Sequence, residues 1–239
     1  MLENLQLQNV LVVDIETVPA QQEYHQLSDR WKALWDRKAK FLAKNEESPE
    51  ELYERAGIYA EFGRVICISV GVYISKGDGY SFRIKSFCDK DEKQVLTDFA
   101  NLLNARYTSS TKALCGHNGK EFDFPFLSRR MLINGIKLPF LLNTAGKKPW
   151  EVNHLDTMEL WKFGDYKSYT SLALLAALFD IPTPKDDIDG SMVREVYYQD
   201  DDLPRIKIYC QKDVVTLANV LLKFKGLSLL LEDDIEYVD

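Results

Sequence analysis

Three short acidic motifs, far apart in the chain, carry the side chains whose types and spacing are suited to chemistry. They lie at residues 14–16 (Asp-Ile-Glu), 118–123 (Asn-Gly-Lys-Glu-Phe-Asp) and 209–213 (Tyr-Cys-Gln-Lys-Asp). A pair of divalent cations acting on a phosphodiester needs several ligands held rigidly around it. Oxygen ligands without a His or Cys cluster favour Mg²⁺ or Mn²⁺ over zinc. The motifs supply four candidate carboxylates and one phenol, those of Asp14, Glu16, Asp123, Asp213 and Tyr209.

The first motif follows an apolar run at residues 10–13, which predicts a buried strand that ends at Asp14. Side chains two residues apart on a strand share a face and lie roughly 6–7 Å apart. Asp14 and Glu16 would therefore reach the same pair of cations. The alternative is a strand end that runs out into solvent, where acidic residues are common.

The second motif ends at Asp123, between a short strand predicted at 113–115 and a helix predicted at 125–134. Phenylalanines on both sides surround this acid with apolar bulk. A buried carboxylate must be capped, paired or bound to a metal. The alternative role of Asp123 is to cap the following helix, which is a frequent use of aspartate.

The third motif lies on a long helix predicted to begin after the acidic run at 200–202 and to end near Phe224. Tyr209 and Asp213 are four residues apart, so they share one face of that helix. This face must meet the strand that carries Asp14 if the motifs form one site. The alternative is a Tyr–Asp pair on the protein surface.

The rest of the pattern predicts the elements that position these motifs. Alternating residues predict two strands joined by a hairpin, and apolar stripes predict an amphipathic helix and a buried one. These elements are expected at 64–74, 81–87, 91–107 and 171–179. Because strands come first and helices dominate the second half, we expect a single α/β domain over residues 1–239. Its mixed sheet of about five strands would be flanked by helices.

Two further segments stand out by composition. Residues 21–60 are expected to form a helical insertion after the first strand, because apolar side chains recur there at helical spacing. Ser48 and Pro49 mark a helix start within it. The insertion would be either a lid or substrate wall, or a surface helical pair packed on the core. The acidic tail, about residues 232–239, is expected to be frayed.

Charge and composition exclude several classes of protein. The net charge of −7 argues against a long basic face that grips duplex nucleic acid. No apolar run approaches the ~18 residues of a membrane span, and no signal peptide is visible. The cysteines show no C-x-x-C spacing, so neither a zinc site nor a redox motif is indicated. We expect buried free thiols, and hence a reducing, cytoplasmic location, for Cys67, Cys88, Cys115 and Cys210.

Taken together, the motifs resemble those of the DEDDy 3′–5′ exonucleases, which have a ribonuclease-H-like (DnaQ-like) fold. The first has the form D-x-E, the second the form N-x-x-x-F-D of family-B DNA polymerase proofreading domains, and the third the form Y-x-x-x-D. The sister DEDDh group has a histidine five residues before its last aspartate, where this chain has Ile208. Similarity to predicted bacterial exonucleases of the family-B type extends to 62–68, 116–118, 123–127, 129–130 and 190–193.

The resemblance, which covers roughly residues 8–225, implies a role for each motif residue. Two Mg²⁺ or Mn²⁺ ions would be held by Asp14, Glu16, Asp123 and Asp213, with Asp14 bridging both. Tyr209 would orient the attacking water, because a phenol with a pKa of ~10 is a poor general base at neutral pH.

The resemblance also implies the substrate, which is the 3′ end of a single-stranded nucleic acid, with DNA favoured. The terminal nucleotide would be seated by Thr17, Asn118 and Phe122. The alternatives are an exoribonuclease acting on short RNA and a non-catalytic binding module of the same fold. A separate polymerase or repair protein is a possible partner.

Four weaker candidates lie outside the motifs. For Asp156 we favour a structural cap over a metal ligand. Arg129 and Arg130 would either approach a phosphate or form a solvated helix face, and Lys167 has the same two readings.

Overall fold

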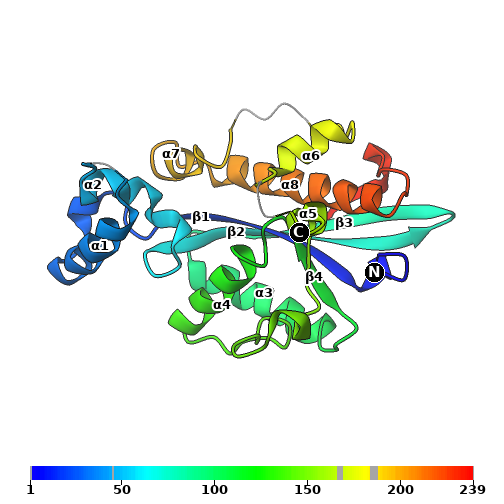
Figure 1. Ribbon diagram of the computed structural model, residues 1–239, viewed down its shortest axis with the longest axis horizontal. Coiled ribbons are helices and arrows are strands. Elements are labelled where there is room, and N and C mark those ends of the chain that lie inside the picture. Colours follow the sequence, from blue (N-terminus) through cyan, green and yellow to red (C-terminus); the bar gives the residue numbers. More distant parts are fainter. Residues whose placement is uncertain (1, 45, 166–168, 184–187, 239) are drawn as a thin grey trace.

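The computed structural model describes residues 2–44, 46–165, 169–183 and 188–238. A six-stranded mixed sheet runs through its centre, in the order β5-β4-β1-β2-β3-β6, with helices on both faces (Figure 1). β1, β2 and β3 are antiparallel neighbours, whereas β4, β5 and β6 join by parallel pairing. The strands are β1 Val10–Pro19, β2 Gly63–Lys76, β3 Gly79–Cys88, β4 Ala113–Gly116, β5 Leu155–Asp156 and β6 Ile235–Val238.

The helices form a layer on each side of the sheet. α3 (Glu92–Arg106) and α4 (Asp123–Ile133) cover one face. The other face carries α6 (Leu172–Leu178), α7 (Val193–Tyr198) and α8 (Leu203–Phe224), and the short α5 (Thr157–Lys162) follows β5. Short 3-10 turns η1, η4 and η5 lie at Leu7–Asn9, Pro149–Glu151 and Glu232–Asp234. This arrangement confirms the predicted α/β fold with a mixed sheet.

Alternation along β1 sets the position of the first motif. Leu11 and Val13 pack into the core that includes residues of α3 and α4. Val10 and Val12 pack on the opposite side, against α8. Since side chains alternate between the two faces of a strand, the even-numbered acids of β1 lie on the α8 side of the sheet.

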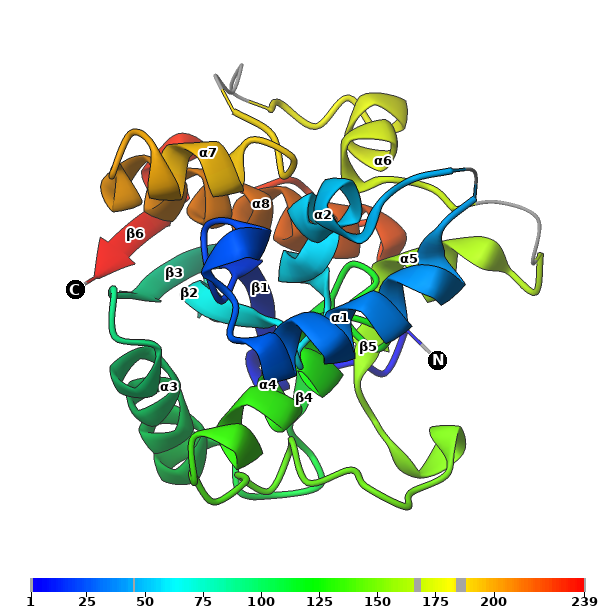
Figure 2. The same cartoon turned by 90° about the vertical axis from the view of Figure 1, so that its left-hand side faces the viewer.

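The predicted helical insertion is confirmed between β1 and β2. It consists of η2 (Tyr24–Gln26), α1 (Asp29–Leu42), α2 (Pro49–Leu52) and η3 (Tyr53–Ile58). Ser48 caps α2 by accepting a hydrogen bond from the Glu51 amide, and Pro49 begins that helix. The insertion has a small core of its own around Trp35. Figure 1 shows α1 and α2 at the end of the molecule toward which β1 runs, and in Figure 2 these helices face the viewer.

Two predicted boundaries were wrong. β1 does not end at Asp14 but continues to Pro19, because β2 pairs with it as far as Gly63. The tail is not frayed over residues 235–238, which form β6 against Phe82–Lys85 of β3. The sheet therefore has six strands rather than about five.

Two predictions about burial and bonding were also wrong. α6 is only partly buried, since Leu174 and Leu178 are 51% and 57% exposed. Cys67 and Cys88 are not free thiols but form a disulfide between β2 and β3, whereas Cys115 and Cys210 are free and buried as expected. Among the described residues, no helix is long and apolar enough to cross a membrane.

Candidate active site

The first motif lies in the middle of β1, where the strand is irregular. Asp14 is paired with Ser69 and Glu16 with Cys67 on β2, and the register then shifts between Glu16 and Thr17. Such a bulge bends a strand and redirects its side chains. Glu16 is 8% exposed, so its carboxylate is held inside the protein rather than at a solvated strand end.

The second motif brings Asp123 to the open side of β1. β4 pairs with β1 only as far as Val12, so the later part of β1 has no strand neighbour on that side. The Ile15 amide donates a hydrogen bond to the Asp123 carboxylate there. Asp123 is buried and is the first residue of α4, whereas Phe122 occupies the cap position. Asp123 is therefore not a conventional helix cap.

The third motif approaches from α8. This helix begins at Leu203 because Asp202 accepts a hydrogen bond from the Arg205 amide and caps it. The Tyr209 hydroxyl donates to the carboxylate of Asp213, one turn further along. The face that carries both residues is turned toward β1, as the third motif required.

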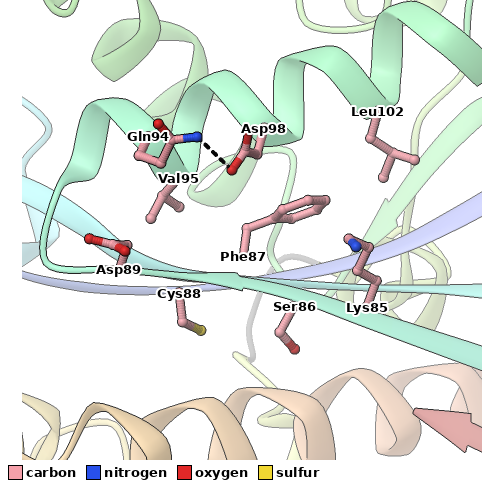
Figure 3. Close-up of a pocket in the computed structure, with 9 residues that line it drawn as sticks. All are labelled: Lys85, Ser86, Phe87, Cys88, Asp89, Gln94, Val95, Asp98 and Leu102. Atoms are coloured by element: carbon pink, nitrogen blue, oxygen red, sulfur yellow. Dashed lines mark hydrogen bonds between the residues drawn. The ribbon is translucent and has the colours of Figure 1, made fainter. Parts of the chain in front are cut away.

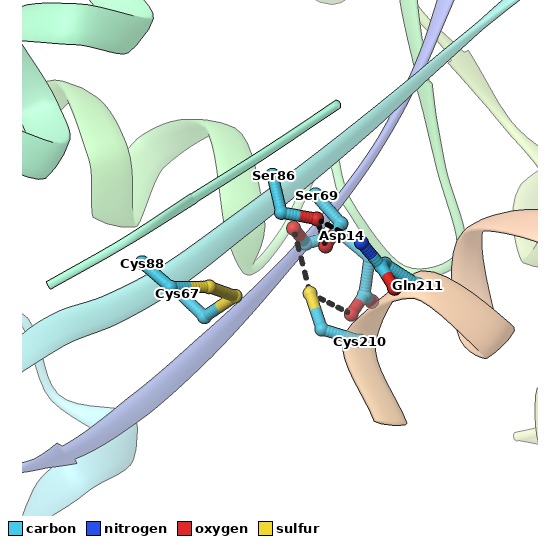
Figure 4. Close-up of a disulfide and its surroundings, with 7 residues drawn as sticks. All are labelled: Asp14, Cys67, Ser69, Ser86, Cys88, Cys210 and Gln211. Carbon is cyan, nitrogen blue, oxygen red and sulfur yellow. Dashed lines mark hydrogen bonds between the residues drawn. A yellow bond between two sulfur atoms is a disulfide. The ribbon is translucent and has the colours of Figure 1, made fainter. Parts of the chain in front are cut away.

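A second contact ties α8 to the first motif. The Cys210 Sγ lies 3.3 Å from Asp14 Oδ2 and 3.5 Å from the Asp14 carbonyl oxygen (Figure 4). Burial raises the pKa of the Cys210 thiol well above its usual value, so the sulfur keeps its proton and donates it to these oxygens. The next residue, Gln211, donates to Ser86 on β3 at 2.9 Å. Sequence reasoning treated Cys210 only as a buried thiol and missed this contact.

The carboxylates lie close enough to repel one another. Burial is the largest cause that raises the pKa of Asp14 and Glu16 well above their usual values, and the charges of Asp123 and Asp213 add to it. Burial likewise raises the pKa of Asp123 to about 7. The pKa of Tyr209 is raised by burial and then by the acids around it. All five predicted catalytic residues are thus brought together.

This donor set fits divalent cations. Single ligand atoms of Asp14, Glu16 and Cys210 lie within 4.8 Å of one another, and the sulfur among them is a protonated donor rather than a thiolate. The remaining ligands are carboxylate oxygens, which suit Mg²⁺ or Mn²⁺. A bound cation would relieve both the burial and the mutual repulsion of these acids.

Asp156 holds the second motif in place from outside the cluster. Its carboxylate accepts hydrogen bonds from the amides of Asn118 and Lys120, both at 3.0 Å. It also accepts from Met158 and Glu159, which makes it the cap of α5. The expected structural role of Asp156 is confirmed. This clamp supports the positive φ of 62° at Asn118, a conformation that asparagine tolerates better than most residues.

The predicted nucleotide-seating residues lie beside the acids in the chain. Thr17 follows Glu16 at the bulge and is partly exposed. Phe122 is partly exposed and packs against Phe126 in a tilted arrangement, with ring centroids 5.5 Å apart. The Phe122 amide donates to the Asn118 carbonyl at 2.9 Å, so these two residues belong to one turn.

The two arginines of α4 differ from each other. Arg129 is exposed, which agrees with a solvated helix face. Arg130 has neither of its expected roles, because it forms a buried ion pair with Glu92 of α3 at 2.5 Å. It also donates to the Ala60 carbonyl at 2.9 Å. Lys167 lies outside the described residues.

Two cavities lie near the sheet. One of about 640 Å³ borders the second motif at Asn118 and Lys120. The other, of about 470 Å³, lies between β3 and α3 (Figure 3) and is lined by none of the motif residues. Gln94 and Asp98 are hydrogen-bonded to each other at its α3 wall. Of these two cavities, the first adjoins the loop that carries the second motif.

The chain is similar to known exonuclease sequences and structures. Residues 58–237 match the family described as "Predicted 3'-5' exonuclease related to the exonuclease domain of PolB". This range contains the second and third motifs, whereas Asp14 and Glu16 precede it. No curated protein matches the chain significantly.

A solved structure shows the same fold. It is the family B DNA polymerase from the hyperthermophilic archaeon Pyrobaculum calidifontis, at 18% sequence identity and a TM-score of 0.54. The likeness covers 90% of this chain but only 24% of the polymerase, and it confirms the ribonuclease-H-like architecture. Because the family match spans well over half of its residues, the chain belongs to the predicted 3′–5′ exonucleases related to the exonuclease domain of PolB.

Proposed function

We propose that this exonuclease removes nucleotides from the 3′ end of single-stranded DNA with the help of two divalent cations, Mg²⁺ or Mn²⁺. The observation that carries the proposal is the convergence of acids from three separate elements, β1, α4 and α8. Burial and the repulsion of neighbouring acids hold the pKa values of Asp14 and Glu16 above their usual range, and burial with the charge of Asp156 does the same for Asp123. Perturbed acids clustered in this way are typical of catalytic sites rather than of structural ones.

The carboxylates would act as the cation ligands. The charges of Glu16, Asp123 and Asp213 all raise the pKa of Asp14, which supports its role as the bridging ligand. Glu16, Asp123 and Asp213 would complete the set. When bound, two such cations lower the pKa of a water molecule and neutralise the charge on the departing 3′ oxygen.

Tyr209 would position the attacking water rather than deprotonate it. Its raised pKa means that the phenol keeps its proton at neutral pH. Its hydroxyl is already oriented by a hydrogen bond to Asp213. A protonated phenol in a fixed orientation can hold a water molecule in line with the scissile bond.

The terminal nucleotide would bind between the first two motifs. Thr17 and Phe122 are the chain neighbours of two of the acids, and Phe122 offers an aromatic surface for a base. Base stacking on an aromatic ring is tolerant of sequence, which suits an exonuclease. The 640 Å³ cavity beside Asn118 provides room next to this seat.

We further propose that residues 1–239 act as one exonuclease domain in the cytoplasm, with a polymerase or repair protein as a possible partner. The disulfide between Cys67 and Cys88 weakens the thiol argument for a reducing compartment. The location therefore rests on Cys115 and Cys210, which are free.

Parallel digestion of single-stranded DNA and RNA oligomers of one sequence tests the substrate. The reactions contain Mg²⁺, Mn²⁺ or EDTA, and Asp213→Ala serves as the inactive control. We expect faster hydrolysis of DNA with either metal and no hydrolysis in EDTA. Faster hydrolysis of RNA would establish the exoribonuclease instead, and equal activity in EDTA would overturn the cation mechanism.

A further inference from the structure

Helix α1 of the insertion carries exposed apolar side chains beside its buried face. Trp35 and Ala39 are buried in the core of the insertion, as expected for a surface helix. Leu34 and Phe41 lie away from this core and are 39% and 89% exposed, whereas Trp31, one turn before Trp35, packs on Phe62 at the edge of the core and is 44% exposed. A surface helix ordinarily keeps its apolar residues on a single stripe. These exposed apolar side chains therefore indicate a binding surface.

A groove runs along these exposed side chains. It has a volume of about 420 Å³, and α1 contributes Trp31, Leu34, Arg37, Lys38 and Phe41 to it. Phe62 forms the floor, 8% exposed, with its ring 5.8 Å from that of Trp31 in an edge-on contact. Glu61 adds one acid to the lining. We call the surface made by Trp31, Leu34, Arg37, Phe41 and Phe62 the α1 platform.

The charge of α1 is opposite to that of the chain. Five Lys or Arg residues against two Asp give the helix a formal charge of +3, whereas the whole chain carries −7. Arg37 and Lys40 are exposed, so their charges face solvent beside the aromatic side chains. An anionic ligand would be attracted to this helix in preference to the acidic remainder of the surface.

The insertion is fastened to the elements around the acidic cluster. Tyr198 of α7 donates to the Pro19 carbonyl at the end of β1, at 2.6 Å. Arg194 of α7 donates to the Gln22 carbonyl at 2.7 Å. Where the chain leaves the insertion before β2, Arg130 of α4 donates to the Ala60 carbonyl, two residues before Phe62. Figure 1 shows α1 beyond the end of β1, with α4 in the same half of the molecule.

We propose that the α1 platform binds the single strand on the 5′ side of the nucleotide being removed. Bases would stack on Trp31 and Phe41, and Arg37 would pair with the phosphates between them. Aromatic rings alternating with cations match the alternation of base and phosphate in a single strand. Ten residues of helix separate the two rings by about 15 Å, the length of about four stacked bases. This inference rests on the proposed single-strand exonuclease function.

The charge pattern favours this occupant over a protein partner. The cores of protein interfaces are depleted of lysine, whereas Lys38 lies inside the groove, over the Tyr59 ring at 4.4 Å. The platform would explain how an enzyme of net charge −7 holds a polyanion long enough to remove successive nucleotides.

Kinetics on two substrate lengths test the platform. Phe41→Ala and Trp31→Ala should each raise KM for a 20-nucleotide single strand about tenfold, the loss expected for one stacked base. The kcat on that strand, and hydrolysis of a trinucleotide too short to reach the platform, should not change. Trp150→Ala, at another exposed tryptophan (76% exposed), is the matched control. Because Phe41 is 89% exposed, its variant should fold normally.

Binding without cleavage separates this inference from the proposed function. Fluorescence anisotropy of a labelled 20-mer in EDTA measures affinity when no strand is cut. Arg37→Gln should reduce the slope of log Kd against log salt by about 0.7, and Lys93→Gln on α3 should not. Unchanged affinity in Phe41→Ala, or no binding by the wild type, would overturn the platform. Tight binding without any hydrolysis by the wild type would support the platform and overturn the exonuclease proposal.

Discussion

Two groups of buried charges lie near the two ends of α4, and their charges are balanced in opposite ways. At its N-terminus, Asp123 joins the acids of β1 and α8, which raise one another's pKa. Further along, Arg130 pairs with Glu92. The Glu92 carboxylate also accepts from the Val65 amide at 2.8 Å and from Asn134 at 3.0 Å.

The difference separates a structural ion pair from a reactive site. The Glu92–Arg130 pair is balanced within the protein and ties α4 to α3 and β2. Under the proposed function, bound cations would balance the charges of the acidic cluster, so the metal-free protein would carry an energetic cost at this end of the helix. A fold can keep such a cost where function requires it, provided that the rest of the core is stable.

Replacing one acid of the cluster should have the largest effect. Asp14→Ala is expected to lower the Mg²⁺-dependent rate at least about 10³-fold, because cation binding supplies several kcal/mol to the transition state. The metal-free variant should unfold no more easily than the wild type, since a repelling charge has been removed. Rate assays and thermal unfolding in EDTA measure the two effects. Asp78→Asn, at an exposed hairpin position, is the control. A substantial loss of metal-free stability would contradict the comparison.

Breaking the Glu92–Arg130 ion pair should lower stability, in contrast to the removal of an acid from the cluster. Arg130→Leu is expected to lower the free energy of unfolding by about 3–5 kcal/mol, because Glu92 would stay buried without a counter-charge. The neighbouring Arg129→Leu, on the exposed side of α4, should change it by less than about 0.5 kcal/mol. Urea denaturation measures both. Equal effects of the two variants would remove the structural role of the pair.

The acidic cluster should also make the stability of the protein depend on pH. The pKa of Asp123 is raised from 3.8 to about 7, so the folded state binds its proton more tightly than the unfolded state. Its contribution to stability is therefore complete below about pH 4 and is lost as pH rises through about 7. Three pKa units correspond to at most about 4 kcal/mol.

Comparing wild type with Asp123→Asn in EDTA isolates this carboxyl from other titrating groups. The burial of His154, for example, lowers its pKa to about 4 and changes stability in the opposite direction. The wild type should lose stability relative to the variant between pH 4 and pH 7. Saturating Mg²⁺ should restore it at neutral pH. A pH-independent difference would show that Asp123 is not strained by its neighbours.

The smallest effect is expected at Tyr209, which belongs to the cluster without contributing a charge. Tyr209→Phe should slow hydrolysis by about 10- to 100-fold, at the low end of proton-transfer and orientation effects. Mn²⁺ affinity measured by calorimetry should change little. An unchanged rate would remove the positioning role, and a large loss of Mn²⁺ affinity would make Tyr209 part of the ion site.

The motifs and their resemblance to those of known exonucleases predicted the acidic cluster, because the first and third motifs lie on regular elements and the second ends at the first residue of a helix. Tyr209 and Asp213 required only that the last helix be recognised. Arg130 could not be placed in the same way, because its partner Glu92 is distant in sequence and helical periodicity does not identify it. The β6 pairing was missed since an acidic segment resembles a frayed tail. In the structure Glu236 pairs with Arg83 across that edge at 2.8 Å.

The disulfide could have been anticipated from the predicted hairpin. The turn pairs Lys76 with Gly79, and counting back along both strands places Cys67 opposite Cys88. The length of β1 could not be anticipated in this way. The residues after Asp14 remain in the strand through pairing with β2 and not through an apolar run of their own.

Digestion of a single-stranded DNA oligomer labelled at its 5′ end tests the central claim most directly. The reaction is run with Mg²⁺, with EDTA and with the Asp14→Ala variant. We predict a ladder of labelled products that shortens from the 3′ end, and no products in EDTA or with the variant. Immediate release of the label as a mononucleotide, or a ladder that persists with Asp14→Ala, would contradict a 3′–5′ exonuclease that works through this acidic cluster.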